Sequence, residues 1–437
     1  MDVVPGRYAF VVHLRYTYRV YPTAPQRSAL TRTFGCVRTV FNDAVAARRK
    51  AHSQGLPYPS TAVLDKRLIT EAKRTPERAW LAEVSTVPLQ QALRDCHAAY
   101  RNFFDSVKGK RARAGVGPPR FKRRSQRQAA RYTRNGFALR ANGRLYVAKI
   151  GDLKVAWSRD LPSEPSSVTI VKTATGKYFA SFVVAVNDDA ERLEPIADPE
   201  AECGIDLGLK DFAVLSSGRV IENPKFFRRM ERKLKKAQRA LSRKERGSAN
   251  RAQARVKVAK VHEQVRNRRD DWLHKQVKTL VGESQALYVE DLNVRGLSRG
   301  RGAKSVQDAA LGRFLVLLEA QAARTGRTFV KVDRWFPSTR LCSACGSLTG
   351  PQGLADLGIR EWACGCGAFH VRDRNAAINI KREGQRLARA HQVAAGQAET
   401  VNACGQDIRP DSSGRPGNPR KKQKQEPTRT RLAPASR

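Results

Sequence analysis

The stretch WACGCGAFHVRDRNAAINI, residues 362–380, places residue types that bind metals directly before the start of a predicted helix. Its two cysteines, Cys364 and Cys366, follow an earlier pair, Cys342 and Cys345, in the segment LCSACGS. Two pairs of thiolates are a ligand set that suits a tetrahedral structural zinc ion. We therefore predict a Zn²⁺ site with these four cysteines as ligands.

Two alternatives to this zinc site stay open. The second pair is C-x-C, one residue tighter than C-x-x-C, so His370 could replace one thiolate, or the four thiols could simply be buried and reduced. A zinc ion with four protein ligands has no open position and is structural. Such a zinc would fix the loop that leads to Asp373, which couples metal binding to the position of that carboxylate.

Three acidic residues lie where a phosphodiesterase site needs them. Asp206 stands in the predicted strand of GIDLG, Glu290 closes the apolar strand of LYVED, and Asp373 starts the last predicted helix. Carboxylates are hard oxygen ligands that suit Mg²⁺. Two such ions about 4 Å apart can activate a water and stabilise the leaving oxygen of a phosphodiester. We predict a site for two Mg²⁺ ions, with Asp211 and Asp291 nearby but outside it.

The elements that must position these carboxylates follow a definite order. Three short strands come first, with Gly204 and Gly208 allowing a backbone or a phosphate to approach closely. A long basic helical hairpin, a buried strand, a helix ended by Gly326, another strand and a last helix come next. This order is that of an RNase H-like nuclease fold. The predicted segments are Cys203–Leu207, Phe212–Ser216, Arg219–Glu222, 225–282 (broken near Gly247-Ser248), 286–294, 310–326 and TFVKVDRW.

Residues 1–190 are predicted to be β-strands around inserted basic helices. The stretch 8–20 is β-branched and aromatic, so it predicts a strand. It carries charges and no cleavage site, so it does not fit a signal peptide. Thr23 and Gln26 have capping-box spacing. Two hairpins are predicted around Asn142-Gly143 and over VTIVKTATGKYFASFVVAV. The inward residues of the two predicted helices are Leu30, Phe34, Val37 and Phe41, and then Leu89, Leu93, Tyr100 and Phe104.

The net charge of +43 on 437 residues indicates a polyanionic partner, with nucleic acid first. Cations and aromatics alternate in GPPRFKRRSQRQAARYTRNG, where cations can contact phosphates and aromatics can stack on bases. A flexible basic loop is the alternative there, and a salt-bridged helix surface is the alternative for NRRDDWLHK. No run of eighteen apolar residues occurs, so no membrane span is predicted. The predicted nucleic-acid contacts are Arg120, Lys122, Arg123, Arg124, Arg268, Arg269 and Lys275.

Several of these motifs, in this order, resemble the TnpB family, the OrfB-type "transposases" of bacterial insertion sequences. The resemblance covers roughly residues 8–383 and includes GIDLGLKDFAVLSSG, VEDLNVRGL, VDRWFPSTRLCSACG and HVRDRNAAINI. TnpB proteins are RNA-guided DNA endonucleases similar to ancestors of the type V CRISPR effectors. Asp206, Glu290 and Asp373 fall on the catalytic positions of the family, and the four clustered cysteines fall on its zinc positions. Val371 replaces the first Asp of the common HDRD pattern.

The resemblance implies a mixed α+β protein of two lobes. The first, 1–190, would be a β-barrel with a helical recognition insertion at about 22–125. The second, 191–383, would be a RuvC-type nuclease with a zinc ribbon at about 338–370. Beyond the resemblance, residues 409–437 are rich in Arg, Lys, Pro and Ser with almost no large apolar side chains, and we predict a basic, disordered tail over 384–437. The implied partners are a guide RNA and double-stranded and single-stranded DNA, with no membrane, in a bacterial cytoplasm near the nucleoid.

Two other functions compete with guided cleavage. A true transposase would use the same carboxylates for strand transfer, so the site cannot separate it from a nuclease. A non-catalytic nucleic-acid-binding regulator is the third hypothesis, and the intact set of three carboxylates argues against it. The guide, the motif flanking the target and the oligomeric state cannot be predicted from the sequence.

Overall fold

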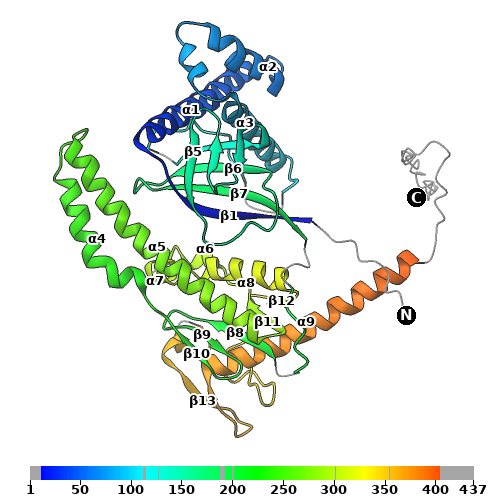
Figure 1. Ribbon diagram of the computed structural model, residues 1–437. Coiled ribbons are helices and arrows are strands. Elements are labelled where there is room, and N and C mark those ends of the chain that lie inside the picture. The colour runs from blue at the N-terminus through cyan, green and yellow to red at the C-terminus, as the bar shows by residue number, and fades with distance from the viewer. Residues whose placement is uncertain are drawn as a thin grey trace, which may run out of the picture. The chain divides into compact units, whose positions relative to one another are not determined.

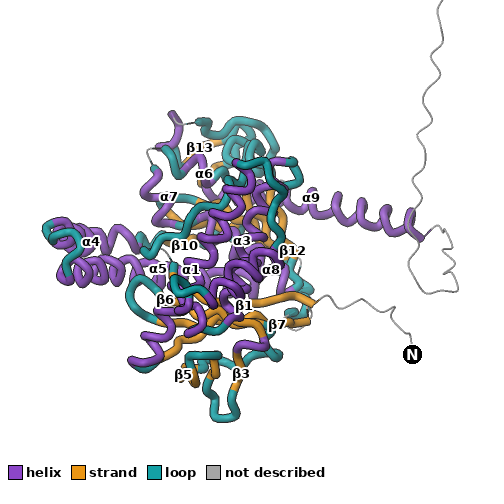
Figure 2. Tube along the Cα trace, turned by 90° about the horizontal axis from the view of Figure 1, so that it is seen from above, coloured by secondary structure: helices purple, strands orange, loops and turns teal. Residues whose placement is uncertain are grey.

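The computed structural model describes residues 11–111, 115–125, 127–187, 192–198, 201–300, 302–353 and 355–403. The chain divides into two compact units, Met1–Gly384 and Gln385–Arg437. Figure 1 labels the elements, and Figure 2 colours them by secondary structure. Among the described residues, no helix combines the length and the apolar character that crossing a membrane requires.

The first part of the larger unit contains a seven-stranded sheet in the order β2-β6-β7-β1-β5-β4-β3, with every pair antiparallel. Its edge strands β2 and β3 are separated by only three residues, 134–136, so the sheet comes close to closing on itself. Tyr18, Tyr132 and Phe182 are buried inside it. Both predicted hairpins are present. The strands are β1 (Val11–Tyr21), β2 (Gln128–Thr133), β3 (Phe137–Leu139), β4 (Leu145–Val147), β5 (Gly151–Ala156), β6 (Ser167–Lys172) and β7 (Tyr178–Asn187).

The helices of this part are inserted between β1 and β2. They are α1 (Ala24–Ser53), α2 (Thr61–Asp65) and α3 (Thr86–Val107), with short π and 3-10 segments over 66–83. Gln26 accepts a hydrogen bond from the backbone N–H of Thr23 at 2.9 Å, as the capping-box spacing predicts. The predicted apolar faces of α1 and α3 are buried, with one exception. Phe104 is 41% exposed, because it stacks edge-on against Tyr58 at the surface instead of entering the core.

The second part of the larger unit contains a five-stranded sheet in the order β10-β9-β8-β11-β12. β8 pairs antiparallel with β9 and parallel with β11, and β11 pairs parallel with β12. Strands that are buried on both faces need continuous apolar sequence, which the segment ALYV of β11 supplies. The strands are β8 (Glu202–Leu207), β9 (Asp211–Leu215), β10 (Val220–Glu222), β11 (Ala286–Glu290) and β12 (Thr328–Val332).

The helices of this part include the predicted hairpin. α4 (Phe226–Ser242) and α5 (Ala249–Glu283) run side by side and are separated at Gly247-Ser248 (Figures 1 and 2). α6 (Val294–Leu297), α7 (Ala303–Ala309) and α8 (Leu311–Thr325) follow β11. The core contains Phe212, Leu273 and Phe314, which connect the sheet to α5 and α8. α8 ends at Gly326, whose φ of +73° is the left-handed conformation of a helix C-terminus.

The end of the chain differs from the prediction in one respect. A small sheet of β13 (Glu361–Ala363) and β14 (Phe369–Val371) leads into α9 (Arg372–Ala403). The disordered tail is predicted to begin at residue 384, but α9 covers the first twenty residues of that tail, up to Ala403. The sequence from 385 to 403 is rich in Ala, Gln and Arg, which favour helix even without an apolar stripe. Residues 404–437 lie outside the described part of the chain, and so do residues 8–10 of the first predicted strand.

Candidate active site and cysteine cluster

The first two candidate carboxylates lie on neighbouring strands of the five-stranded sheet. Ile205 of β8 is the register partner of Val289 of β11, so the next residues, Asp206 and Glu290, lie side by side. Adjacent strands are about 4.8 Å apart, and side chains at matched positions of parallel strands point to the same face. Both residues are half-buried. The sheet itself therefore brings these two predicted residues together.

The third carboxylate comes from α9, whose backbone lies directly on the sheet. A Cβ built on Gly204 would lie 2.1 Å from the carbonyl oxygen of Ala377, and one built on Gly384 would lie 2.2 Å from the ring of Tyr288. The space that the sequence left open at Gly204 is thus filled by the helix. Asp373, in the first turn of α9, reaches a pocket that Asp206 also lines.

The charges in this pocket are only partly balanced. Burial, and then the charges of Asp373 and Glu290, raise the pKa of Asp206 to about 7. Burial and the neighbouring Asp291 raise the pKa of Glu290. Carboxylates that resist ionisation next to one another fit a divalent cation, because the cation would supply the missing positive charge. Hard oxygen donors of this kind suit Mg²⁺.

Two arginines that were not predicted to belong to the site contact the third carboxylate. Arg360 donates to Asp373 Oδ2 at 2.9 Å, and Arg372 donates to Asp373 Oδ1 at 3.0 Å. Arg372 precedes Asp373 directly, so its proximity could have been expected. Arg360 arrives from thirteen residues away through the loop before β13, and no sequence signal marks it.

The two acidic residues that were predicted to lie outside the site differ from one another. Asp291 pairs with Arg334. Asp211, the first residue of β9, lines the same pocket as Asp206 and is therefore closer to the site than its place after the turn suggested. Lys210 lines the pocket as well.

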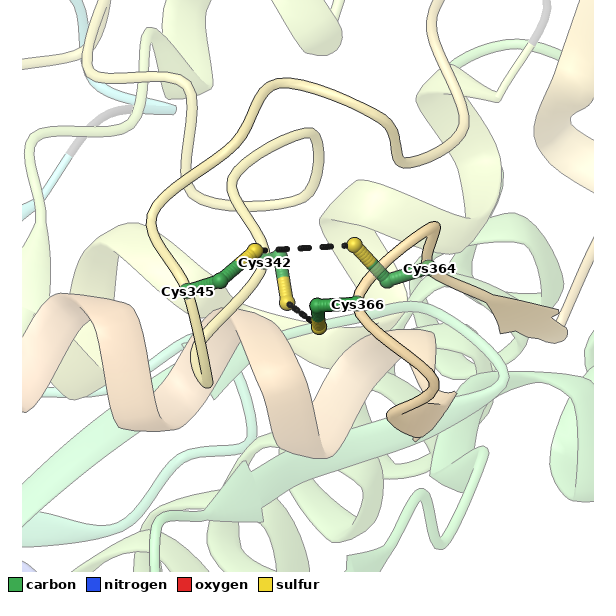
Figure 3. Close-up of side chains that lie close together, drawn as sticks. All are labelled: Cys342, Cys345, Cys364 and Cys366. Atoms are coloured by element: carbon green, nitrogen blue, oxygen red, sulfur yellow. Dashed lines mark hydrogen bonds between the residues drawn. The ribbon is translucent and has the colours of Figure 1, made fainter.

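The four clustered cysteines converge as predicted (Figure 3). Their sulfur atoms all lie within 4.8 Å of one another. Sγ of Cys345 lies 3.6 Å from Sγ of Cys364, and Sγ of Cys342 lies 3.8 Å from Sγ of Cys366. Four sulfurs at about 2.3 Å around a tetrahedral centre would be about 3.8 Å apart, so the cluster can hold a metal ion.

Neighbouring groups favour the thiolate form of two of these cysteines. Hydrogen bonding from the hydroxyl and backbone of Ser347 lowers the pKa of Cys345 to about 6. A backbone N–H and the hydroxyl of Thr349, which donates to Sγ at 3.2 Å, lower the pKa of Cys364. His370, the alternative ligand, is buried with Nε2 3.0 Å from Cys342 Sγ. It lies beside the cluster as a hydrogen-bond partner of one sulfur.

Two buried asparagines tie the first cysteine turn to α9. Asn375 accepts from the backbone N–H of Ser343 at 2.8 Å and donates to the carbonyl of Leu341 at 2.8 Å. Asn379 donates to the same carbonyl at 2.6 Å and to that of Ser338 at 2.9 Å. The turn that carries Cys342 is therefore bonded to the helix that carries Asp373. This is the physical link between the cysteine pairs and the Asn-rich helix start.

The predicted nucleic-acid residues fall into two groups. Lys122 and Arg123 line a pocket with four other arginines, while Arg120 and Arg124 are exposed beside it. Lys122 is half-buried, and its Nζ lies 3.7 Å from the ring centre of Phe41. The second group lies on α5.

On α5, two of the three predicted contacts have partners within the chain. Arg269 pairs with the buried Asp308 at 3.4 Å, and Lys275 pairs with Asp271 at 3.0 Å. Arg268 is exposed. At Arg269 and Lys275 the structure therefore agrees with the alternative interpretation, a salt-bridged helix surface.

Comparisons with known proteins agree with the motifs. Family models match at residues 12–56 ("Helix-turn-helix domain"), 181–301 (OrfB_IS605, "Probable transposase") and 312–380 ("Cas12f1-like, TNB domain"). A "Putative RNA-guided DNA endonuclease" of Streptomyces pristinaespiralis is 43% identical, with 95% of this chain and 96% of the relative covered. The chain belongs to the OrfB (TnpB-type) family.

Other relatives extend this OrfB assignment. "Putative RNA-guided DNA endonuclease InsQ" of Escherichia coli K12 is 30% identical, with 94% of this chain and 97% of the relative covered. A protein chain in the cryo-EM structure of a Cas12f1-sgRNA-target DNA complex has a TM-score of 0.52 at 13% identity, covering 85% of this chain and 99% of the other. At that identity the likeness is one of fold. The OrfB chain therefore has a mixed α/β fold similar to that of Cas12f1.

Proposed function

We propose that this protein is an RNA-guided DNA endonuclease that hydrolyses phosphodiesters in a RuvC-like domain. The observation that carries the proposal is the convergence of Asp206, Glu290 and Asp373 at the end of a sheet with the order β10-β9-β8-β11-β12. An RNase H-like nuclease has this strand order and these three positions. The names of the relatives from Streptomyces and Escherichia support the guided activity.

The residues of the pocket have distinct roles in this proposal. Asp206 and Glu290 would hold divalent cations from the sheet, and Asp373 would complete the ligand set from α9. When bound there, Mg²⁺ would activate a water and stabilise the leaving oxygen. Arg360 and Arg372 orient Asp373 and balance its charge. Because Asp373 is retained and Arg372 fixes it, Val371 in place of an aspartate is compatible with activity.

In the same proposal, the cysteine cluster is a structural Zn²⁺ site. Zinc would use all four cysteines and leave no open position, so it would stabilise the turn that Asn375 and Asn379 bond to α9. The division into a barrel with helical insertion (1–190) and a nuclease with zinc ribbon (191–383) belongs to the same proposal. The proposal also includes a guide RNA and both duplex and single-stranded DNA as partners, and a location near the bacterial nucleoid.

A second function has one observation in its favour. The family model over residues 181–301 carries the description "Probable transposase". Strand transfer would use the same metal-held carboxylates, with a DNA 3′ hydroxyl in place of water as the nucleophile. A requirement for RNA separates the two activities, because a transposase has no need of a guide.

The test is cleavage of a plasmid library with a randomised flank beside a fixed target. The protein is coexpressed with the DNA that flanks its own gene, so that a guide can be transcribed, and is assayed in Mg²⁺ beside Asp206→Ala. We expect RNA-dependent cuts next to one enriched flank, absent in the variant. RNA-free joining of DNA ends would favour the transposase. A folded, zinc-loaded, RNA-bound protein that never cuts would refute the nuclease.

A further inference from the structure

The turn that follows β12 leaves one large aromatic side chain in solvent. Trp335 is 84% exposed, the highest exposed fraction among the large apolar side chains that the structure describes. The other four tryptophans each contact an aromatic ring or a guanidinium group, whereas Trp335 has no such contact within the described part of the chain. The four contacts are Trp80 with Arg78, Trp157 with Phe182, Trp272 with Phe212 and Trp362 with His370. The face of the Trp335 indole is therefore available to a partner outside the chain.

Hydrogen bonds and an ion pair fix the backbone around this exposed indole. The side chain of Asp333 accepts from the backbone N–H of Trp335 at 2.8 Å. Arg334 pairs with Asp291, which directly follows β11. At the end of the turn, the carbonyl of Ser338 accepts a hydrogen bond from α9 at 2.9 Å. A turn held in this way does not have to be ordered when a partner binds, so binding costs less conformational entropy.

The turn lies at the edge of the sheet that carries the candidate carboxylates. Val332, the last residue of β12, is the register partner of Glu290, and β8, β11 and β12 run parallel, so their carboxyl ends share one edge. Trp335 follows Val332 by three residues, so its Cα lies within about 16 Å of that of Glu290. Thr339, four residues further on, lines the pocket of Asp206. Trp335 is therefore close enough to contact a strand whose reacting bond lies in that pocket.

The surroundings of Trp335 favour a flat ligand with polar edges over an apolar protein surface. Its neighbours in the chain, Asp333 and Arg334, are both exposed, so the indole is a single aromatic face within a polar surface. A protein interface needs a contiguous core that excludes water. An unpaired base needs only one flat ring on which to stack, and its polar edges can remain in water. A base inside a duplex is already covered by its neighbours, so such a ring prefers a single strand.

We propose that Trp335 stacks on an unpaired base of the DNA strand that enters the carboxylate pocket. Trp335 would then be a positioning residue, which fixes one nucleotide beside the pocket so that the reacting phosphodiester is held at the metal ligands. Every base has a flat π face, so this contact would not depend on the sequence of the strand. The inference deepens the proposed function, on which it rests for the presence of a DNA strand in the pocket.

The first experiment removes the bases of the substrate strand one at a time. The RNA-loaded, full-length protein cleaves target DNA in Mg²⁺, with an abasic nucleotide at each position around the cut in turn, and single-turnover rates are measured. Trp335→Ala removes the ring and Trp335→Phe retains one. The matched control is Trp80→Ala, because Trp80 is the next most exposed tryptophan at 36%. Binding of the same target DNA is measured in EDTA, where cleavage cannot interfere.

We expect Trp335→Ala to cleave intact DNA about tenfold more slowly, as the loss of one stacked base predicts, with unchanged target binding in EDTA. One abasic position should slow the wild type and Trp80→Ala by the same factor and should slow Trp335→Ala no further. Trp335→Phe should remain within about threefold of the wild type. Losses that add at every abasic position, or a Phe variant as slow as the Ala variant, would overturn the proposal.

A second measurement separates this inference from the nuclease activity itself. Tryptophan fluorescence of the RNA-loaded, full-length protein is recorded in EDTA while a short single-stranded DNA is added. Because stacking on a base quenches indole emission, the wild type and Trp80→Phe should lose a component of the emission that Trp335→Phe lacks from the start. Identical quenching in the wild type and Trp335→Phe would refute the stacking even in a protein that cuts DNA. A component missing only from Trp335→Phe would support it even in a protein that never cuts.

Discussion

The carboxylate pocket and the cysteine cluster are both candidate metal sites, but they are built in opposite ways. Asp206, Glu290 and Asp373 come from three distant segments that a buried sheet and a closely packed helix hold together. The cysteines come from two short turns whose own core is little more than Trp362 and two of the sulfurs. A site made by a large core is complete before a metal binds, whereas a site made by turns needs its metal in order to fold.

The two sites should differ most when the carboxylate of Asp206 is removed, because activity should be lost without a loss of stability. Asp206→Ala takes away one cation ligand and one of three crowded negative charges. RNA-dependent cleavage should fall at least about a thousandfold, or about 4 kcal/mol of transition-state stabilisation, while the melting temperature stays level or rises. Asp291→Asn is the matched control, because Asp291 pairs with Arg334 and should leave cleavage within about threefold. Equal losses in both variants would contradict the assigned site.

A mutation in the cysteine cluster should instead affect metal binding and local folding more strongly than cleavage. Cys364→Ser removes one of the four sulfurs, so bound zinc should drop from one equivalent to none and limited proteolysis should cut within residues 338–370. Cleavage should fall by about 10- to 100-fold, because the turn bonded to α9 is loosened.

Two further variants sharpen this result. Cys203→Ser, which changes a half-buried thiol far from the cluster in sequence, should retain the zinc. His370→Gln should also retain it, since His370 is a neighbour of one sulfur. Full zinc content in Cys364→Ser, or loss of zinc in His370→Gln, would return His370 to the ligand set.

The same contrast explains how much could be predicted from the sequence. The strands around Asp206 and Glu290 were predictable because their apolar runs and turn glycines are local signals. The convergence of the cysteines was predictable because paired thiols at short spacing have few other uses. The side-by-side register of Asp206 with Glu290 needed only the order of the elements and the ends of the strands.

What could not be predicted depends on packing between distant segments. Arg360 reaches Asp373 only because the loop before β13 folds back, and Asn375 looks like any polar residue of a helix until Ser343 lies against it. Phe104 fits an apolar helix face but remains at the surface beside Tyr58. The extension of α9 could not be predicted because residues 385–403 carry few large apolar side chains, so no buried face marks them as a helix.

The packing of α9 on the sheet gives the next test. Gly204→Ala would place a methyl group 2.1 Å from a helix carbonyl, so the backbone must shift. We expect a loss of about 2–3 kcal/mol in the free energy of unfolding and a severe loss of cleavage, because Asp373 moves with the helix. Gly282→Ala in α5 has nothing within 4 Å of the added methyl and should be neutral or slightly stabilising. A neutral Gly204→Ala in a urea titration would mean that α9 does not rest on β8.

The smallest expected effect is the pH dependence of the carboxylate pocket without metal. The pKa of Asp206, about 7, lies above the ordinary value of an aspartate. Below about pH 4 the carboxyl is protonated in both the folded and the unfolded chain, so it does not change the free energy of unfolding. Between about pH 4 and 7 the unfolded chain gives up this proton while the folded chain retains it, so the free energy of unfolding falls as pH rises.

Asp206→Asn removes this titration and should isolate it. In EDTA the variant should equal the wild type near pH 4.5 and exceed its free energy of unfolding by about 2 kcal/mol near pH 8, a value reduced because the residue is half-buried. Added Mg²⁺ should then stabilise the wild type near pH 8 and leave the variant almost unchanged, because the metal replaces the missing proton at Asp206. A difference that stays constant across this range, or an equal response of both proteins to Mg²⁺, would mean that Asp206 is not the strained ligand of the pocket. The cysteine cluster should not add to the free energy of unfolding as pH rises in EDTA. Thiols that lose their protons repel one another, and only a bound metal can offset this repulsion.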